Sequence, residues 1–112
     1  MQENDKPVLI YTTFPSTESA DAAGGGLVEA GLAACVNIIA GMTSIYRWEG
    51  KIARDSEAVM IVKTRDSLAE AVMGKVKELH PYDAPAFLVV PVVGGSAEYI
   101  GWLMQETAAK PG

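Results

Sequence analysis

The stretch Thr43-Ser44-Ile45-Tyr46-Arg47-Trp48-Glu49-Gly50-Lys51-Ile52 lies near the centre of the chain and predicts a β-hairpin. Its first half is rich in β-branched and aromatic residues, which favour extended strands. Glu49-Gly50 is a tight-turn signal, because glycine adopts the positive φ that short hairpin turns need. The chain is therefore expected to reverse direction here and to return as a second strand from Lys51.

Both arms of this hairpin extend beyond the quoted stretch. Residues 32–39 are extended in pattern, with Gly41 bending or interrupting the strand, and residues 57–64 are apolar on both faces. Arms of about 13 residues, at about 3.3 Å per residue, reach roughly 40 Å. A domain of this size has a radius of gyration of about 13 Å, so the hairpin must overhang. Its apolar faces then need a partner to cover them.

A strand and a helix are expected on the N-terminal side. Residues 8–14 are β-branched and aromatic, and Pro15 ends the strand. Ser16 is placed to cap a helix that begins at Thr17 and ends at Gly31.

The run Gly24-Gly25-Gly26 falls inside this helix. It could be a phosphate-binding loop, but no Lys-Ser or Lys-Thr pair follows it and no GxGxxG spacing exists. We interpret it as a thin helix face packed close to the sheet, although each glycine costs the helix about 1 kcal/mol relative to alanine.

A second helix, a last strand and a third helix are expected on the C-terminal side. Asp66 or Ser67 is the expected cap of the second helix, with Ser67 and Glu70 spaced as a capping box. The side chains of this helix that are expected to face the core are Leu68, Val72, Val76 and Leu79. His80-Pro81 is expected to end the helix. The strand spans residues 87–93, and Ser96 caps a helix whose inward side chains are Ile100, Leu103 and Met104.

The resulting order is β-α-β-β-α-β with an added C-terminal helix. Right-handed crossovers place both main helices on one face of an antiparallel sheet, which predicts an α+β, ferredoxin-like sandwich with a long protruding central hairpin. We expect one domain over residues 1–112, with frayed tails at 1–7 and 108–112.

Composition narrows the function classes. The chain has 112 residues, a formal net charge of -5 and nine Lys and Arg residues that are scattered, which disfavours nucleic acid. No apolar run is long enough to span a membrane, and the N-terminus is not that of a signal peptide. Cys35 is the single cysteine, so no internal disulfide forms, and we expect a reducing cytoplasm.

Several motifs in sequence carry a family resemblance. They are Ala33-Ala34-Cys35-Val36-Asn37-Ile38, Ser44 through Ile52, Glu57, Lys63-Thr64 and His80-Pro81-Tyr82-Asp83-Ala84-Pro85. Together they resemble the CutA family, the divalent-cation tolerance proteins. The resemblance implies a cytoplasmic homotrimer, similar in architecture to the PII signalling proteins. It also implies a non-enzymatic function in tolerance of copper and other divalent cations.

The resemblance also bears on metal ligands. Some family members bind copper through a first-strand cysteine and a His-His pair before Pro-Tyr. This chain has Thr12 and Leu79-His80 at those positions, so only His80 carries over. We expect at most weak binding of Cu(II) or Zn(II), by His80 and Asp83, and no organic cofactor. Alternatively, His80 only ends its helix and bonds nearby backbone.

The remaining polar and aromatic candidates lie in the hairpin and in the loop after the second helix. Tyr46 and Trp48 share a strand face and could form a ligand wall or an interface. Glu57 and Lys63 are edge charges or a pair at a subunit boundary, and Cys35 is most simply a small buried apolar residue. These hairpin residues and Tyr82 define a predicted cleft between subunits. An enzyme with an inter-subunit active site is the alternative function, although no complete catalytic motif is present.

Overall fold

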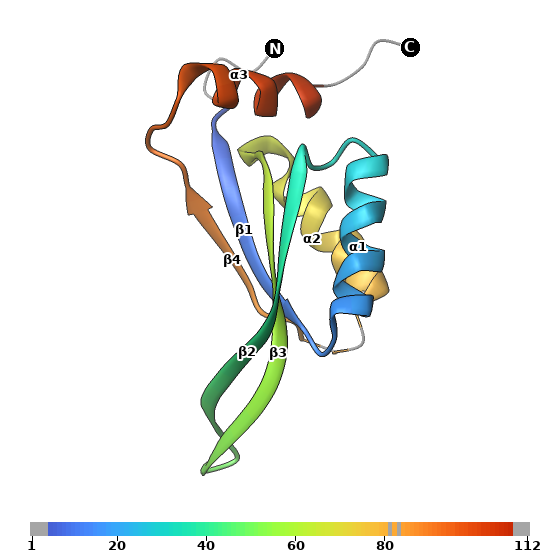
Figure 1. Ribbon diagram of the computed structural model, residues 1–112, viewed down its shortest axis with the longest axis vertical. Coiled ribbons are helices and arrows are strands. Elements are labelled where there is room, and N and C mark those ends of the chain that lie inside the picture. The colour runs from blue at the N-terminus through green and yellow to red at the C-terminus, as the bar shows by residue number, and fades with distance from the viewer. Residues whose placement is uncertain (1–4, 81, 83, 109–112) are drawn as a thin grey trace.

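The computed structural model describes residues 5–80, 82 and 84–108. The elements are β1 (Pro7–Phe14), α1 (Thr17–Glu29), β2 (Cys35–Trp48), β3 (Lys51–Arg65), η1 (Asp66–Leu68), α2 (Ala69–Leu79), β4 (Phe87–Pro91) and α3 (Ala97–Glu106). Helices α1 and α2 cover one face of the sheet, and α3 crosses one end of it (Figure 1). The predicted α+β, ferredoxin-like class is confirmed.

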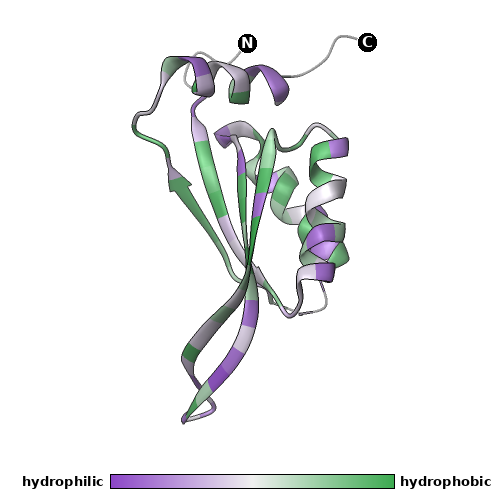
Figure 2. Cartoon of the chain, in the orientation of Figure 1, coloured by the Kyte–Doolittle hydropathy of each residue, from purple (hydrophilic) through white to green (hydrophobic). Residues whose placement is uncertain are grey.

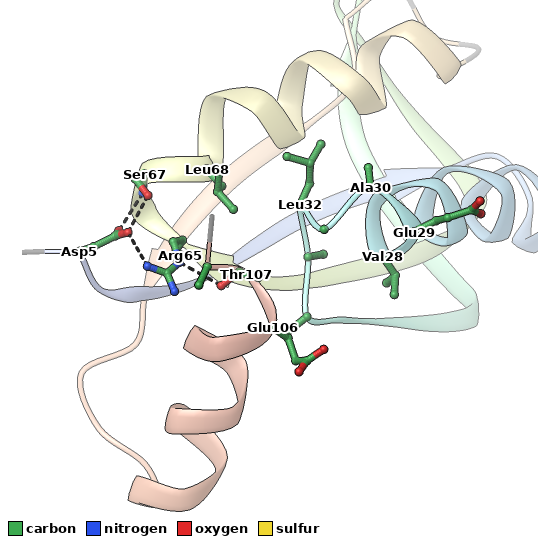
Figure 3. Close-up of a pocket in the computed structure, with 14 residues that line it drawn as sticks. Asp5, Val28, Glu29, Ala30, Leu32, Arg65, Ser67, Leu68, Glu106 and Thr107 are labelled. Atoms are coloured by element: carbon green, nitrogen blue, oxygen red, sulfur yellow. Dashed lines mark hydrogen bonds and ion pairs between the residues drawn. The ribbon is translucent and has the colours of Figure 1, made fainter. Parts of the chain in front are cut away.

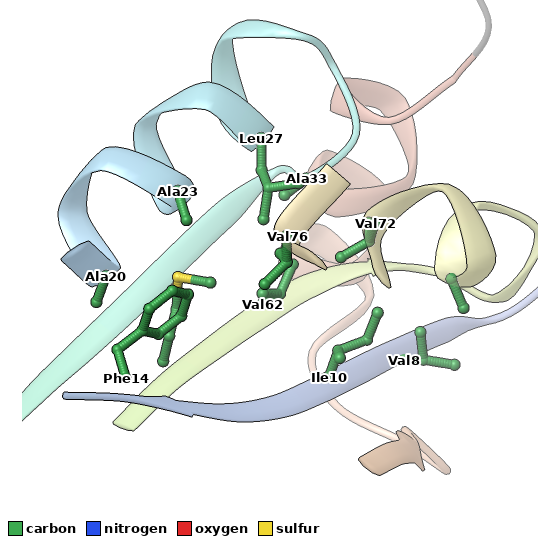
Figure 4. Close-up of a cluster of buried hydrophobic side chains, with 12 residues drawn as sticks. Val8, Ile10, Phe14, Ala20, Ala23, Leu27, Ala33, Val62, Val72 and Val76 are labelled. Carbon is green, nitrogen blue, oxygen red and sulfur yellow. The ribbon is translucent and has the colours of Figure 1, made fainter. Parts of the chain in front are cut away.

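The sheet has the strand order β2-β3-β1-β4, and every neighbouring pair is antiparallel. Alternate side chains of β1 point under the helices, so Val8, Ile10 and Phe14 are buried. They pack in one cluster with side chains of α1, such as Leu27, and of α2 and β3 (Figure 4). The core therefore lies between the helix layer and the inner half of the sheet.

Two local features shape the β2–β3 hairpin. Glu49 and Gly50 both have positive φ, 49° and 79°, as a two-residue turn matching the strand twist requires. Between Ile39 and Met42 the register shifts, and Gly41 has a φ of 76°, which a glycine adopts without steric cost. Gly41 thus bends β2 without interrupting it.

The hairpin protrudes from the domain, as predicted (Figure 1). The longest dimension is 48 Å and the radius of gyration is 15.0 Å, against about 13 Å for a compact domain of this length. Purple and green segments alternate along the protruding part in Figure 2, and Ile45, Trp48 and Ile52 are 59%, 65% and 55% exposed. These apolar side chains lie beyond the reach of the helix layer.

Strands β2 and β4 each lose residues that were predicted to belong to them. Residues 32–34 precede β2, because Gly31, with a φ of 75°, closes α1 and the Leu32 amide donates to the Leu27 carbonyl. Strand β4 ends at Pro91, which has no amide hydrogen to donate.

The predicted start of the second helix is wrong in detail. The chain first forms the short turn η1, and Leu68, at the cap position of α2, makes no side-chain cap bond. Ser67 instead donates its hydroxyl to Asp5 Oδ2 at 2.6 Å, and its amide donates to Asp5 Oδ1. The capping box with Glu70 is absent, and Leu79, predicted to be a core residue, is 48% exposed at the end of α2.

The prediction of a frayed N-terminal tail is wrong for residues 5–7, because Asp5 is held by several contacts. Its carboxylate pairs with Arg65 at 3.1 Å, and Pro7 already belongs to β1. Arg65 donates further to Thr107 Oγ1 and to the Met104 carbonyl, which holds the end of α3. Residues 5–7 are therefore fixed by this Asp5–Arg65 cluster, while residues 1–4 and 109–112 of the expected tails lie outside the described residues.

The structure explains why the first residue of the Gly24-Gly25-Gly26 run is a glycine. A Cβ atom there would lie 2.7 Å from Val36 Cγ2 and 3.2 Å from Met60 Sδ, so α1 touches the sheet at this point. Gly25, by contrast, is exposed, and a Cβ atom there would meet nothing within 4 Å. The predicted thin helix face is confirmed at Gly24.

This contrast gives a matched pair of variants. Gly24→Ala should lower the free energy of unfolding by about 1–3 kcal/mol, because Val36 and the helix must move apart. Gly25→Ala should raise it by about 0.5–1 kcal/mol through helix propensity alone. Chemical denaturation of both variants measures these changes. Equal changes in the free energy of unfolding would refute the close approach of α1 to Val36 at Gly24.

The Asp5–Arg65 cluster predicts a pH dependence. Burial raises the pKa of Asp5, but the Ser67 hydrogen bonds and the Arg65 charge outweigh it, and the net pKa lies below the ordinary 3.8. The stabilisation is thus complete above 3.8 and is lost as pH falls through the lowered value. The stability difference between wild type and Asp5→Asn should shrink between about pH 7 and about pH 2.5. An unchanged difference would show that the carboxylate charge contributes nothing.

Candidate functional site

Polar side chains gather at the neck of the hairpin, where it leaves the domain. Glu57, half-buried, accepts a hydrogen bond from Ser44 Oγ at 2.7 Å and another from the Tyr82 hydroxyl at 3.2 Å. Two residues back along β3, Asp55 accepts a short hydrogen bond from the Tyr46 hydroxyl. Residues two apart in a strand share a face. We call Ser44, Tyr46, Asp55, Glu57 and Tyr82 the neck cluster.

The electrostatics of the neck cluster favour the neutral form of its two phenols. Burial and the hydrogen bond to Glu57 raise the pKa of Tyr82. The hydrogen bond to Asp55, more than burial, raises the pKa of Tyr46. Each phenol thus keeps its proton and donates it to a carboxylate oxygen, and the cluster contains two acidic side chains and no basic one.

His80 lies behind Tyr82 and is buried, with 8% of its surface exposed. Its Nε2 is 2.6 Å from the Thr13 carbonyl oxygen, and its Nδ1 accepts the Tyr82 backbone amide at 3.1 Å. The ring stacks on Phe14 with centroids 4.3 Å apart. His80 therefore ties the end of α2 to β1, in agreement with the alternative of a backbone-bonding histidine.

Lys63 lies apart from the neck cluster. Its ammonium donates to the Tyr99 hydroxyl of α3 at 3.0 Å and lies 5.2 Å from the Tyr99 ring centroid. The hydrogen bond to Tyr99 is the main reason that the pKa of Lys63 is raised. Within the chain Lys63 does not pair with Glu57.

Two further predicted residues, Trp48 and Cys35, are not part of the neck cluster. Trp48 stands near the hairpin tip and is 65% exposed. Cys35 is half-buried opposite Lys63 on the neighbouring strand, with Asn37 Nδ2 3.9 Å from its sulfur. Asp83, the second predicted metal ligand, lies outside the described residues.

A cavity lies away from these residues. It has a volume of about 1030 Å³ and is bounded by the ends of α1 and α3 and by the Asp5–Arg65 cluster (Figure 3). None of the predicted site residues within the described part of the chain lines it. Asp5, Arg65 and Ser67 are engaged with one another and with α3 there, and the carboxylates of Glu29 and Glu106 point in different directions (Figure 3). Its polar groups serve the packing of α3, so we place the candidate site at the neck.

Sequence reasoning missed Ser44 and Asp55 of the neck cluster, and it missed Tyr99, the partner of Lys63. Asp55 alternates with Glu57 on one strand face, and Ser44 is brought opposite by the register that the Glu49-Gly50 turn sets. Both could have been found by extending the hairpin register from the turn. Tyr99 could not, because only the packing of α3 across the sheet end brings it to Lys63.

No helix among the described residues is long and apolar enough to cross a membrane. The same part of the chain contains no group of three or more His, Cys, Asp or Glu side chains that could hold a metal ion.

Comparison with known proteins agrees with this fold. The family model for the CutA1 divalent ion tolerance protein matches residues 8–106. The Thermus thermophilus divalent-cation tolerance protein CutA is 42% identical over 99 residues, which is 88% of this chain and 96% of that protein. The chloroplastic protein CutA of Arabidopsis thaliana is 42% identical over 110 residues, 96% of this chain.

Solved structures are equally similar. The crystal structure of CutA1 from Oryza sativa superposes with a TM-score of 0.89 at 39% identity, covering 93% of this chain and 95% of that one. The chain spans 60% and 56% of the lengths of the Arabidopsis thaliana and Oryza sativa sequence relatives.

The fold thus defines a ferredoxin-like protein with a protruding hairpin and a polar neck. The chain belongs to the CutA1 divalent ion tolerance protein family, and the predicted resemblance is confirmed.

The neck cluster predicts a selective change in tyrosine titration. Glu57→Gln should lower the pKa of Tyr82 toward its ordinary 10.0, because the carboxylate no longer favours the neutral phenol. The stabilising contact is present below 10.0 and lost as pH rises through the raised value. NMR titration of isotope-labelled tyrosine measures it. Asp55→Asn is the control, and it should lower mainly the pKa of Tyr46.

Proposed function

We propose that the chain acts as a non-enzymatic homotrimer in divalent-cation tolerance, with a PII-like architecture. A ligand site is proposed in the cleft between the hairpin of one copy and its neighbour. The observation that carries the proposal is the protruding hairpin, whose apolar side chains are exposed in the single chain. Family membership supports the cation-tolerance part.

Open sheet edges support assembly. Within the described chain, β2 and β4 are the outer strands of the sheet. Leu88 and Val90 of β4 are 62% and 45% exposed, so this edge combines unpaired backbone groups with apolar surface. Three copies related by a three-fold axis would cover the hairpins and these edges in equivalent ways.

The side chains of the neck cluster determine which kind of ligand is proposed. Carboxylate oxygens of Asp55 and Glu57 suit a divalent cation or a small cationic ligand, and Tyr46, Trp48 and Tyr82 supply aromatic walls. Lys63 of a neighbouring copy would balance the carboxylate charge at the cleft, because Lys63 of the same copy lies apart from the neck cluster. Weak Cu(II) binding through oxygen ligands fits this donor set, and no organic cofactor is part of the proposal.

The cellular location belongs to the same proposal. A single free cysteine, Cys35, suits a reducing compartment, and we place the protein in the cytoplasm. Relatives are named as chloroplastic in plants and as periplasmic in Archaeoglobus fulgidus, and those locations are their own.

The trimer is tested by light scattering and by one hairpin variant. We expect a mass about three times the chain mass of 11.8 kDa at micromolar concentration. Trp48→Ala should weaken assembly by about 2 kcal/mol or more, as a buried aromatic anchor does.

Val28→Ala, at an exposed position on α1, is the matched control and should leave assembly unchanged. A single species with the chain mass would contradict the proposal.

A further inference from the structure

The copper ligands that the family resemblance implies do not fit this chain. Those positions hold Thr12, Leu79 and His80. Thr12 is fully buried under the helix layer, and among the described residues its hydroxyl has no hydrogen-bond partner. A threonine hydroxyl does not replace a thiolate as a copper or zinc ligand, and Leu79 carries no donor atom.

His80 is the only residue of the three with a suitable atom, and both of its ring nitrogens are already used. The Tyr82 backbone amide can only donate, so Nδ1 must accept. The ring proton therefore sits on Nε2 and is donated to the Thr13 carbonyl oxygen at 2.6 Å. The hydrogen bonds assign one neutral tautomer, with no ring lone pair left for a metal.

The ring faces are covered as well. Phe14 stacks on the imidazole with an interplanar angle of 23°, and the Tyr82 ring lies 4.9 Å away at a tilt of 41°. A metal at Nδ1 would have to displace the Tyr82 amide, and a metal at Nε2 would have to displace a β1 carbonyl. Either change leaves a buried polar group without a partner, which is costly.

We infer that His80 is not a metal ligand in this protein. It is a positioning residue, whose neutral ring joins β1 to the segment after α2 and thereby holds the Tyr82 hydroxyl against Glu57. The predicted binding of Cu(II) or Zn(II) by His80 and Asp83 is replaced by a structural role for His80. This inference stands independently of the trimer and of its proposed ligand site.

The chain has a single histidine, so its imidazole signals are unambiguous. In NMR spectra of the isotope-labelled wild-type protein near neutral pH, we expect the Nε2–H tautomer. Zn(II), which is diamagnetic, should leave the imidazole nitrogen shifts unchanged at about tenfold excess, because ligation requires a free ring lone pair. A zinc-dependent shift of either ring nitrogen would overturn the inference.

A variant adds a second measurement. His80→Phe keeps an aromatic ring beside Phe14 but removes both hydrogen bonds. Calorimetric titration with Cu(II) should give affinities for wild type and variant that agree within about twofold. A loss of about tenfold or more in His80→Phe would make His80 a ligand and refute the proposal.

The positioning role has its own readout. In His80→Phe the Tyr82 segment should separate from Glu57, so the pKa of Tyr82 should fall toward 10.0, as in Glu57→Gln. His80→Gln, which can donate to the Thr13 carbonyl, is the conservative control and should retain part of the shift. A Tyr82 pKa that is unchanged in His80→Phe would show that His80 does not position Tyr82.

Discussion

The register of the β2–β3 hairpin is the constraint on which the rest of the structure depends. A two-residue turn at Glu49-Gly50 starts the pairing, and the bulge at Gly41 shifts it by one residue before the strands enter the domain. Side chains alternate between faces, so this shift decides which residues of β2 meet the helices. Val36 faces α1 at Gly24 as a result, and Cys35 lies opposite Lys63.

The arms of 14 and 15 residues are longer than the helix layer that covers their base. The base supplies the core, and the outer part leaves Ile45, Trp48 and Ile52 in contact with solvent in the single chain. Near the tip, backbone pairing from Tyr46–Ala53 to Trp48–Lys51 joins the two arms. This exposed apolar surface is the physical reason for proposing that the chain assembles with other copies.

The neck joins these two parts and carries the polar chemistry. Glu57 stands where β3 passes from the protruding arm into the buried sheet, so its carboxylate is half-buried and is satisfied by two hydroxyl donors. One donor comes from β2, and the other from the segment that His80 fixes against β1. At the opposite end, Arg65 joins Asp5 and the last turn of α3, so each end of the sheet carries a half-buried charged residue with several partners.

Local sequence signals determined the element order, the tight turn, the Ser16 and Ser96 caps and the protruding hairpin, because each depends on residues a few positions apart. Periodicity also identified most of the core, including Val72 and Val76. Only the tertiary structure decided the partners of Ser67, Lys63 and His80. Ser67 donates a hydrogen bond to Asp5 instead of capping α2, and Lys63 donates one to Tyr99 instead of pairing with Glu57. Both ring nitrogens of His80 form hydrogen bonds with backbone groups. These contacts join segments that are distant in the chain, or they depend on how such segments pack. Each of these side chains can bond to several kinds of polar partner, and only the packing brings one of those partners within hydrogen-bond distance.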